Sequence, residues 1–172
     1  MKKFLLLPLL LASLCASPVL LARGVYQTPS DFLAEAFAGA VPKPAMIWLT
    51  GETRRVAEEI LQHKPSRLRL RYWARGKRSA WVLEEIGKEK PITVGIVIDN
   101  GQIERLRVLA FRESRGDEVR HDFFTRQFTR ARLQPNRQLD RPIDGISGAT
   151  LSVRALHKLA RLALYLDQQR QS

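Results

Sequence analysis

The stretch PITVGIVIDNGQIERLRVLAF, residues 91–111, decides the predicted fold. Its first half, Ile92 to Ile98, is almost entirely apolar, which is typical of a strand buried on both faces. Asp99-Asn100-Gly101 follows, a strong signal for a tight turn between antiparallel strands. Residues 103–111 complete the hairpin, and their arginines indicate a solvated edge. The stretch therefore predicts an antiparallel meander and argues against a parallel, nucleotide-binding sheet.

A strict two-residue period divides the second strand of this hairpin between two faces. The period places Ile103, Arg105, Arg107 and Leu109 on one face and Leu106, Val108 and Ala110 on the other. Upstream, residues 67–73 alternate between arginine and apolar side chains, which predicts a half-exposed strand. A loop at residues 74–78 leads to another strand at 79–86, and residues 45–49 form a short strand of their own.

Four segments carry a helical pattern: residues 32–38, 53–63, 118–130 and 150–168. In the third segment the pattern turns Val119, Phe123, Phe124 and Phe128 inward. The apolar stripe of the last helix consists of Leu151, Ala155, Leu159, Leu162 and Leu166. Together with the strands, these helices predict an α+β fold, a small antiparallel sheet packed with helices.

A motif of small and polar residues, DGISGAT, leads from a proline-marked loop into the last helix at residues 144–150. Ser147 is a good N-cap residue, and Gly148 and Ala149 allow close approach to the backbone. Thr150 falls in the first turn, where free N–H groups and the helix dipole favour an anion. Taken alone, these residues also fit a capped helix with no further role.

DGISGAT resembles the flavinylation motif D-x-x-S/T-G-A-T/S of the FMN-binding domain family, and it matches every fixed position, from Asp144 through Ser147, Gly148 and Ala149 to Thr150. That family includes the covalent-FMN subunits of the sodium-pumping NADH:quinone oxidoreductase and of the Rnf complex. The resemblance implies that FMN is joined by a phosphoester to the Thr150 hydroxyl. It also implies that a separate, magnesium-dependent flavin transferase uses FAD to attach the FMN. Asp144, Ser147, Gly148 and Ala149 would then be recognised by that enzyme or bind the cofactor.

A second segment, Glu113-Ser114-Arg115-Gly116, is by itself a polar turn. It resembles the E-T-P-G-x-G segment that lies against the flavin in many members of the same family. Glu113 and Gly116 match that segment, whereas Arg115 and Glu118 depart from it. The resemblance implies that Glu113 and Gly116 contribute to the cofactor site.

The first 22 residues have the pattern of a secretory signal peptide, with a basic start, an apolar run and a small residue, Ala22, at the cleavage point. An uncleaved membrane anchor and a lipoprotein modified at Cys15 are the alternatives. Cleavage would remove the single cysteine, so that the mature chain would contain no disulfide, cysteine-ligated metal or cysteine nucleophile. The predicted location is periplasmic or otherwise extracytoplasmic, with membrane association possible.

The formal charge of this 172-residue chain is +12, from 29 basic and 17 acidic residues. The basic residues are spread along the sequence without a nucleic-acid-binding motif, so we expect no nucleic-acid partner. They favour an acidic redox partner or the surface of an anionic membrane. The three histidines, His63, His121 and His157, show no metal-ligand spacing, and no residues form a recognisable catalytic group.

The sequence therefore predicts a signal peptide at residues 1–22, an N-terminal extension at 23–90 and an FMN-binding domain at 91–169. The resemblance implies an exported flavoprotein that carries covalent FMN and passes electrons to a membrane or periplasmic redox partner. It favours a carrier or subunit over a stand-alone enzyme. The alternatives are a basic periplasmic binding module without redox activity and a flavin-dependent reductase of a small substrate.

Overall fold

A computed structural model describes residues 24–171, so the predicted leader lies outside the described residues. Five antiparallel strands form one sheet in the order β1-β2-β3-β4-β5. The strands are β1 (Ala45–Trp48), β2 (Arg69–Arg75), β3 (Arg78–Ile86), β4 (Pro91–Asp99) and β5 (Gln102–Phe111). The helices are α1 (Pro29–Ala36), α2 (Gly51–Leu61), α3 (Asp122–Thr125) and α4 (Thr150–Gln169), with 3₁₀ turns η1 (Asp117–Arg120) and η2 (Arg126–Phe128). The predicted α+β class and antiparallel meander are confirmed.

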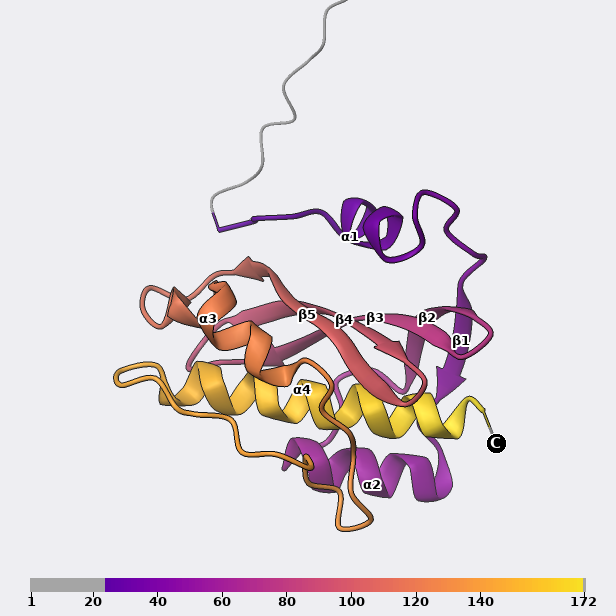
Figure 1. Ribbon diagram of the computed structural model, residues 1–172. Coiled ribbons are helices and arrows are strands. Elements are labelled where there is room, and N and C mark those ends of the chain that lie inside the picture. The colour runs from indigo at the N-terminus through magenta and orange to yellow at the C-terminus, as the bar shows by residue number, and fades with distance from the viewer. Residues whose placement is uncertain (1–23, 172) are drawn as a thin grey trace, which may run out of the picture.

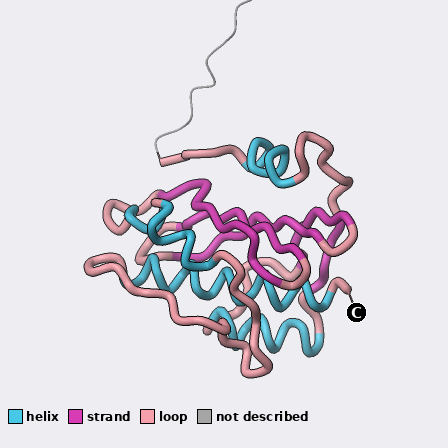
Figure 2. Tube along the Cα trace, in the orientation of Figure 1, coloured by secondary structure: helices cyan, strands magenta, loops and turns pink. Residues whose placement is uncertain are grey.

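The sheet lies between two unequal helical layers (Figure 1). α4 and α2 cover one face, and the larger apolar core lies between them and the sheet. α1 covers part of the opposite face, as the tube in Figure 2 also shows. The smaller cluster beneath α1 contains Phe32, Leu33, Ala36, Phe37, Ala80, Val97 and Leu109. Within residues 24–171, none of the helices has both the length and the apolar character that a transmembrane span requires.

The β4–β5 hairpin departs from the strict alternation expected for its second strand. The register shifts at two places, between Thr93 and Val94 and between Val97 and Ile98. Each shift is a β-bulge that changes which face the following side chain occupies. Ile103 therefore joins Leu106 and Val108 in the larger core, although alternation placed it on the opposite face.

The predicted helix at residues 118–130 is wrong, because this segment contains three short turns, η1, α3 and η2. The chain becomes extended at His121, with φ −76° and ψ 151°, which interrupts the helix after one turn. Val119, Phe124 and Phe128 are buried as expected. Phe123 instead points to solvent and is 58% exposed, because the break changes the phase of the following turn.

α4 is the longest helix and is tied to the sheet near its C-terminal end. Asp167 is fully buried there and accepts a hydrogen bond of 2.5 Å from the Ser79 hydroxyl. The indole N–H of Trp81 donates to the same hydroxyl at 2.9 Å. Arg170 forms an ion pair of 2.7 Å with Asp167 and compensates its buried charge. At the other end of the helix Leu151 is exposed, so the predicted apolar stripe begins only at the second turn.

Candidate functional site

The DGISGAT motif forms a turn followed by the start of α4. The Ala149 N–H donates to the Ile146 carbonyl at 3.0 Å, which closes a turn around Ser147 and Gly148. Gly148 has φ +81°, a left-handed conformation that glycine adopts without strain. The N-cap position is Ala149, and no side chain caps the helix there. The prediction that Ser147 is the N-cap is therefore wrong, because the turn places the helix start after it.

Thr150 is the first residue of α4, and it is exposed. No described residue accepts a hydrogen bond from the backbone N–H of Thr150, Leu151 or Ser152; the first bond of the helix runs from Val153 to Ala149 at 2.9 Å. Three free N–H groups at the positive end of a 20-residue helix are a favourable environment for a phosphate. The acceptor hydroxyl and an anion-binding backbone thus occur at the same position.

Gly116, the last residue of the Glu113–Gly116 segment, lies directly against the start of α4. Gly116 has φ +88°, and a Cβ atom built there would lie 2.8 Å from the Ser152 hydroxyl and 3.4 Å from the Ala149 Cβ. Only a residue without a side chain allows this approach. Gly116 and the start of α4 at Ala149 and Thr150, more than thirty residues apart in the sequence, therefore belong to one site.

Glu113, in contrast to Gly116, forms hydrogen bonds with the turn between β3 and β4. Its Oε1 atom accepts hydrogen bonds from the backbone N–H groups of Lys88, Glu89 and Lys90, at 2.6, 2.6 and 2.8 Å. Burial raises the pKa of the Glu113 carboxyl, but these three donors outweigh that effect and hold the pKa below its ordinary value of 4.5. Glu113 thus fixes the β3–β4 turn. Its contact with a flavin stays a prediction.

Replacing Glu113 with glutamine should reduce stability at neutral pH by about 1–3 kcal/mol, because hydrogen bonds to a charged acceptor are stronger than those to a neutral one. The folded-state pKa is lowered, so the carboxylate stabilises the fold above its unfolded pKa, near 4.5. This advantage is lost as the pH falls through the lower, folded-state pKa. Urea denaturation of both proteins from pH 7 to pH 3 should show the stability difference shrinking with acid. A difference that is constant with pH would contradict this role.

The first residue of the motif is held by the turns that follow β5. The Asp144 N–H donates to the side-chain Oε1 of Gln127 at 2.7 Å, whereas the Asp144 side chain is exposed. Ile143 and Ile146 pack against the larger core and fix the loop on either side of Asp144. Sequence reasoning missed the role of Gln127, since only the folded chain brings it to this loop.

The edge of the site is basic. Arg154 lies one turn after Thr150, and Arg115 is next to Gly116; both are exposed and form no ion pair with a described residue. Two free guanidinium groups beside a free helix start make this surface favourable for an anion. Because Arg154 lies one turn after Thr150, we predict that it contacts a phosphate oxygen.

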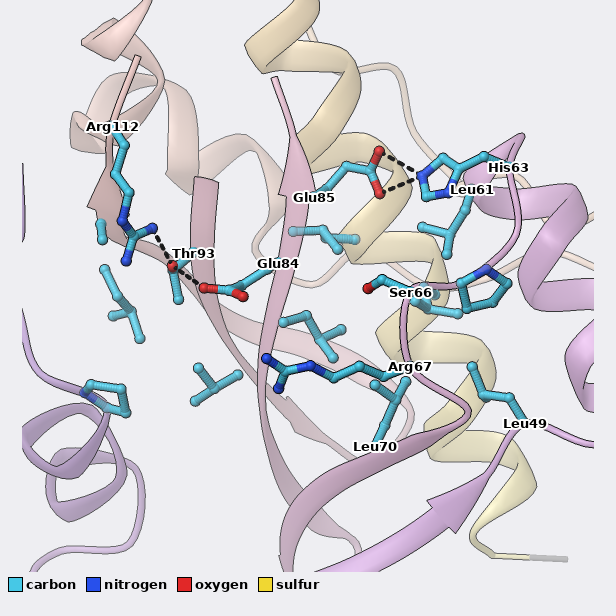
Figure 3. A pocket seen from close by; sticks show the side chains of 18 of the residues that line it. Leu49, Leu61, His63, Ser66, Arg67, Leu70, Glu84, Glu85, Thr93 and Arg112 are labelled. Carbon is cyan, nitrogen blue, oxygen red and sulfur yellow. Dashed lines mark hydrogen bonds and ion pairs between the residues drawn. The ribbon is translucent and has the colours of Figure 1, made fainter. Parts of the chain in front are cut away.

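A cavity of about 420 Å³ lies elsewhere, along the edge of β3 (Figure 3). Beyond Trp81, β3 has no partner on the β2 side, and β2 diverges from it. One wall carries a chain of hydrogen bonds from Arg112 to the Thr93 hydroxyl and from that hydroxyl to Glu84, each 2.9 Å long. None of the residues of DGISGAT or the Glu113–Gly116 segment lines this cavity, so it is separate from the helix-start site.

His63 and Glu85 meet at the same cavity, where the imidazole Nε2 lies 2.9 Å from a carboxylate oxygen (Figure 3). The Lys64 carbonyl, which binds the other ring nitrogen, and the Glu85 carboxylate both raise the pKa of His63. Lys158 of α4 lies 3.7 Å from the same carboxylate and compensates its burial. His63, Glu85 and Lys158 therefore compensate one another's charge and polarity. Within residues 24–171, no cluster of His, Cys, Asp or Glu has the composition of a metal site.

Fold and site together define a small α+β domain that presents a hydroxyl at an anion-binding helix start. Residues 87–165 match the family model described as the FMN-binding domain, so this part of the chain is similar to that family. The match contains both Gly116 and the complete DGISGAT motif.

Among solved structures, the chain is similar to the crystal structure of NqrC from Shewanella oneidensis, with a TM-score of 0.58. The superposition covers 83% of this chain and 96% of the other, at 14% sequence identity. At that identity the likeness shows a shared fold. No curated protein matches the chain.

The described residues fit FMN in three respects. Thr150 supplies an exposed hydroxyl, the first turn of α4 supplies free N–H donors for a phosphate, and Gly116 leaves no side chain against Ala149 and Ser152. When bound, FMN would supply one- and two-electron redox chemistry. The protein supplies the attachment and the electrostatic environment.

Proposed function

We propose that this chain is an exported flavoprotein that carries FMN covalently on Thr150 and transfers electrons outside the cytoplasm or at the membrane. One observation carries the proposal: the family match contains DGISGAT, and the final hydroxyl of that motif is exposed at the free start of α4. The likeness of the fold to NqrC supports the same class of protein.

Attachment requires an outside catalyst. Thr150 forms no hydrogen bond with a described histidine or carboxylate, so no base is positioned to activate its hydroxyl. A flavin transferase using FAD would form the bond between the Thr150 oxygen and the FMN phosphorus while the pyrophosphate bond breaks. AMP then leaves with the hydroxyl proton. Asp144, Ser147 and Gly148 are exposed and accessible to such an enzyme.

Electron transfer fits this site better than turnover of a small substrate. The helix start lies at the surface, and the cavity of about 420 Å³ is lined by none of the motif residues. A covalent cofactor also suits an exported protein, since FMN that dissociated outside the cytoplasm would not be replaced. The redox partner we propose is a periplasmic or membrane protein that approaches the basic edge of the site.

The test is the intact mass of the protein purified from a host that contains the flavin transferase. We expect an increase equal to one FMN esterified to the chain, retained after denaturation and located by peptide mapping on the peptide containing Thr150. The same mass shows whether residues 1–22 have been removed. A colourless protein of unmodified mass would contradict the proposed function and would favour a binding module without redox activity.

A further inference from the structure

The outer face of β1 and β2 is left uncovered by the helices. α1 contacts β3 and β4 on this side of the sheet, and Trp73 is the residue of β2 that packs against the α1 cluster. Beyond it, Arg69 and Arg71 pair across the strands with Trp48 and Met46. These four side chains are exposed, and we refer to them as the β1–β2 face.

The strands of the β1–β2 face and the segments next to them in sequence carry charge of one sign. Residues 64–78 contain seven lysines and arginines and no acidic residue, and residues 40–50 also contain no acidic residue. Seven of the cations there form no ion pair with any described residue: Lys43, Lys64, Arg67, Arg69, Arg71, Arg75 and Lys77. These stretches therefore contribute a large part of the net positive charge of the protein.

The apolar members of the face are unusual for a surface. Trp48 is 58% exposed and Met46 is 40% exposed, whereas Trp81 of the core is fully buried. The Arg69 guanidinium lies 5.5 Å from the centre of the Trp48 ring, a cation–π geometry. This contact keeps the ring at the surface beside a cation.

We propose that the β1–β2 face docks the protein onto an anionic lipid bilayer. Tryptophan is favoured at the membrane–water interface, and arginine binds lipid phosphate groups with its paired N–H donors. A basic surface near anionic lipids is attracted by the surface potential, and exposed apolar side chains add burial among the headgroups. A bilayer also requires no shape complementarity from the two short strands.

Docking in this way sets the orientation of the molecule. The β1–β2 face lies on the α1 side of the sheet, whereas α2 and α4 pack on the other (Figure 1). α4 would therefore face away from the lipid surface and remain accessible to proteins in solution. This docking does not depend on the flavin, so it can be tested on protein with or without the cofactor.

The experiment is co-sedimentation of the purified protein with vesicles of phosphatidylcholine alone or mixed with phosphatidylglycerol. We expect binding to the mixed vesicles that weakens in high salt and little binding to phosphatidylcholine. The double variant Arg69→Glu, Arg71→Glu should lower the affinity at least about tenfold, from the loss and reversal of charge near the surface. Trp48→Ala should weaken binding without changing net charge. All three residues are exposed, so thermal unfolding should be unchanged.

The matched control is Arg126→Glu, Arg130→Glu, which makes the same change in net charge at exposed residues outside the β1–β2 face. It should bind the mixed vesicles nearly as well as the unmodified protein. Equal losses in both double variants would overturn the proposal, because binding would then follow overall charge. Equal binding to both kinds of vesicle, or no binding to either, would also overturn it. Duplex DNA provides a further probe: binding that requires Arg69 and Arg71 on DNA but not on vesicles would assign the face to a nucleic acid.

Discussion

Replacing Thr150 with alanine is expected to abolish covalent flavin labelling in cells that contain the transferase, and replacement with serine is expected to retain it. Serine keeps the hydroxyl at the start of α4, whereas alanine removes the atom that forms the phosphoester. Valine is the matched control, because it keeps the branched shape of threonine and lacks only the hydroxyl. In-gel flavin fluorescence after denaturation, followed by intact mass, measures the result.

The outcomes of this series separate the attachment residue from the function. Label that persists in both Thr150→Ala and Thr150→Val would place the ester on another hydroxyl, and Ser147 in the preceding turn would be examined first. The protein would then still be a covalent flavoprotein. Absence of label from the unmodified protein would instead contradict the proposed function. Because Thr150 is exposed and makes no side-chain hydrogen bond, all the variants should fold normally.

Replacing Asp167 with alanine is expected to lower the free energy of unfolding by about 3–5 kcal/mol, the usual effect of removing one partner of a buried ion pair. The change leaves the Arg170 guanidinium, whose side chain is only 7% exposed, without its carboxylate. It also removes the acceptor of the Ser79 hydroxyl, which in turn supports the Trp81 indole. Urea denaturation with the midpoint and slope both reported measures the loss.

The control for Asp167 is Asp144→Ala, which removes a carboxylate that is exposed and forms no ion pair with a described residue. Its effect should stay within about 0.5 kcal/mol, as for most surface substitutions. A second control combines Asp167→Leu with Arg170→Leu, which removes both charges and should recover part of the loss. A loss below about 1 kcal/mol in Asp167→Ala would show that the buried pair is not important for stability.

Long periodic segments of the sequence were sufficient to predict the framework of the fold. The apolar run of β4 and the Asp99-Asn100-Gly101 turn specify the hairpin, and the amphipathic pattern specifies α4. The two bulges in β5 were not predictable, because a bulge changes the face of a side chain without changing the character of the residues. The break at His121 was missed for a similar reason, since three buried apolar residues at helical spacing also fit three short turns.

The candidate site was predictable where it depends on a local motif. DGISGAT identifies the start of α4 from sequence alone, although its turn around Ser147 and Gly148 depends on a left-handed glycine that the sequence does not reveal. The contact between Gly116 and Ala149 and the three hydrogen bonds to Glu113 require the folded chain. The sequence therefore indicates where α4 begins, whereas the contacts of Gly116 and Glu113 become visible only in the folded chain.

The two ends of α4 differ in a way that bears on how the protein matures. The C-terminal end is fixed by Asp167 in the core, and the N-terminal end has no side-chain cap. Helix ends without caps fray, so the first turn opens and closes at little cost while the rest of the helix stays folded. If a flavin transferase modifies Thr150, as we propose, local unwinding of this turn would let the exposed residue leave the helix and extend into the enzyme. The lack of a cap would then cost a little stability and make the attachment residue easier to reposition.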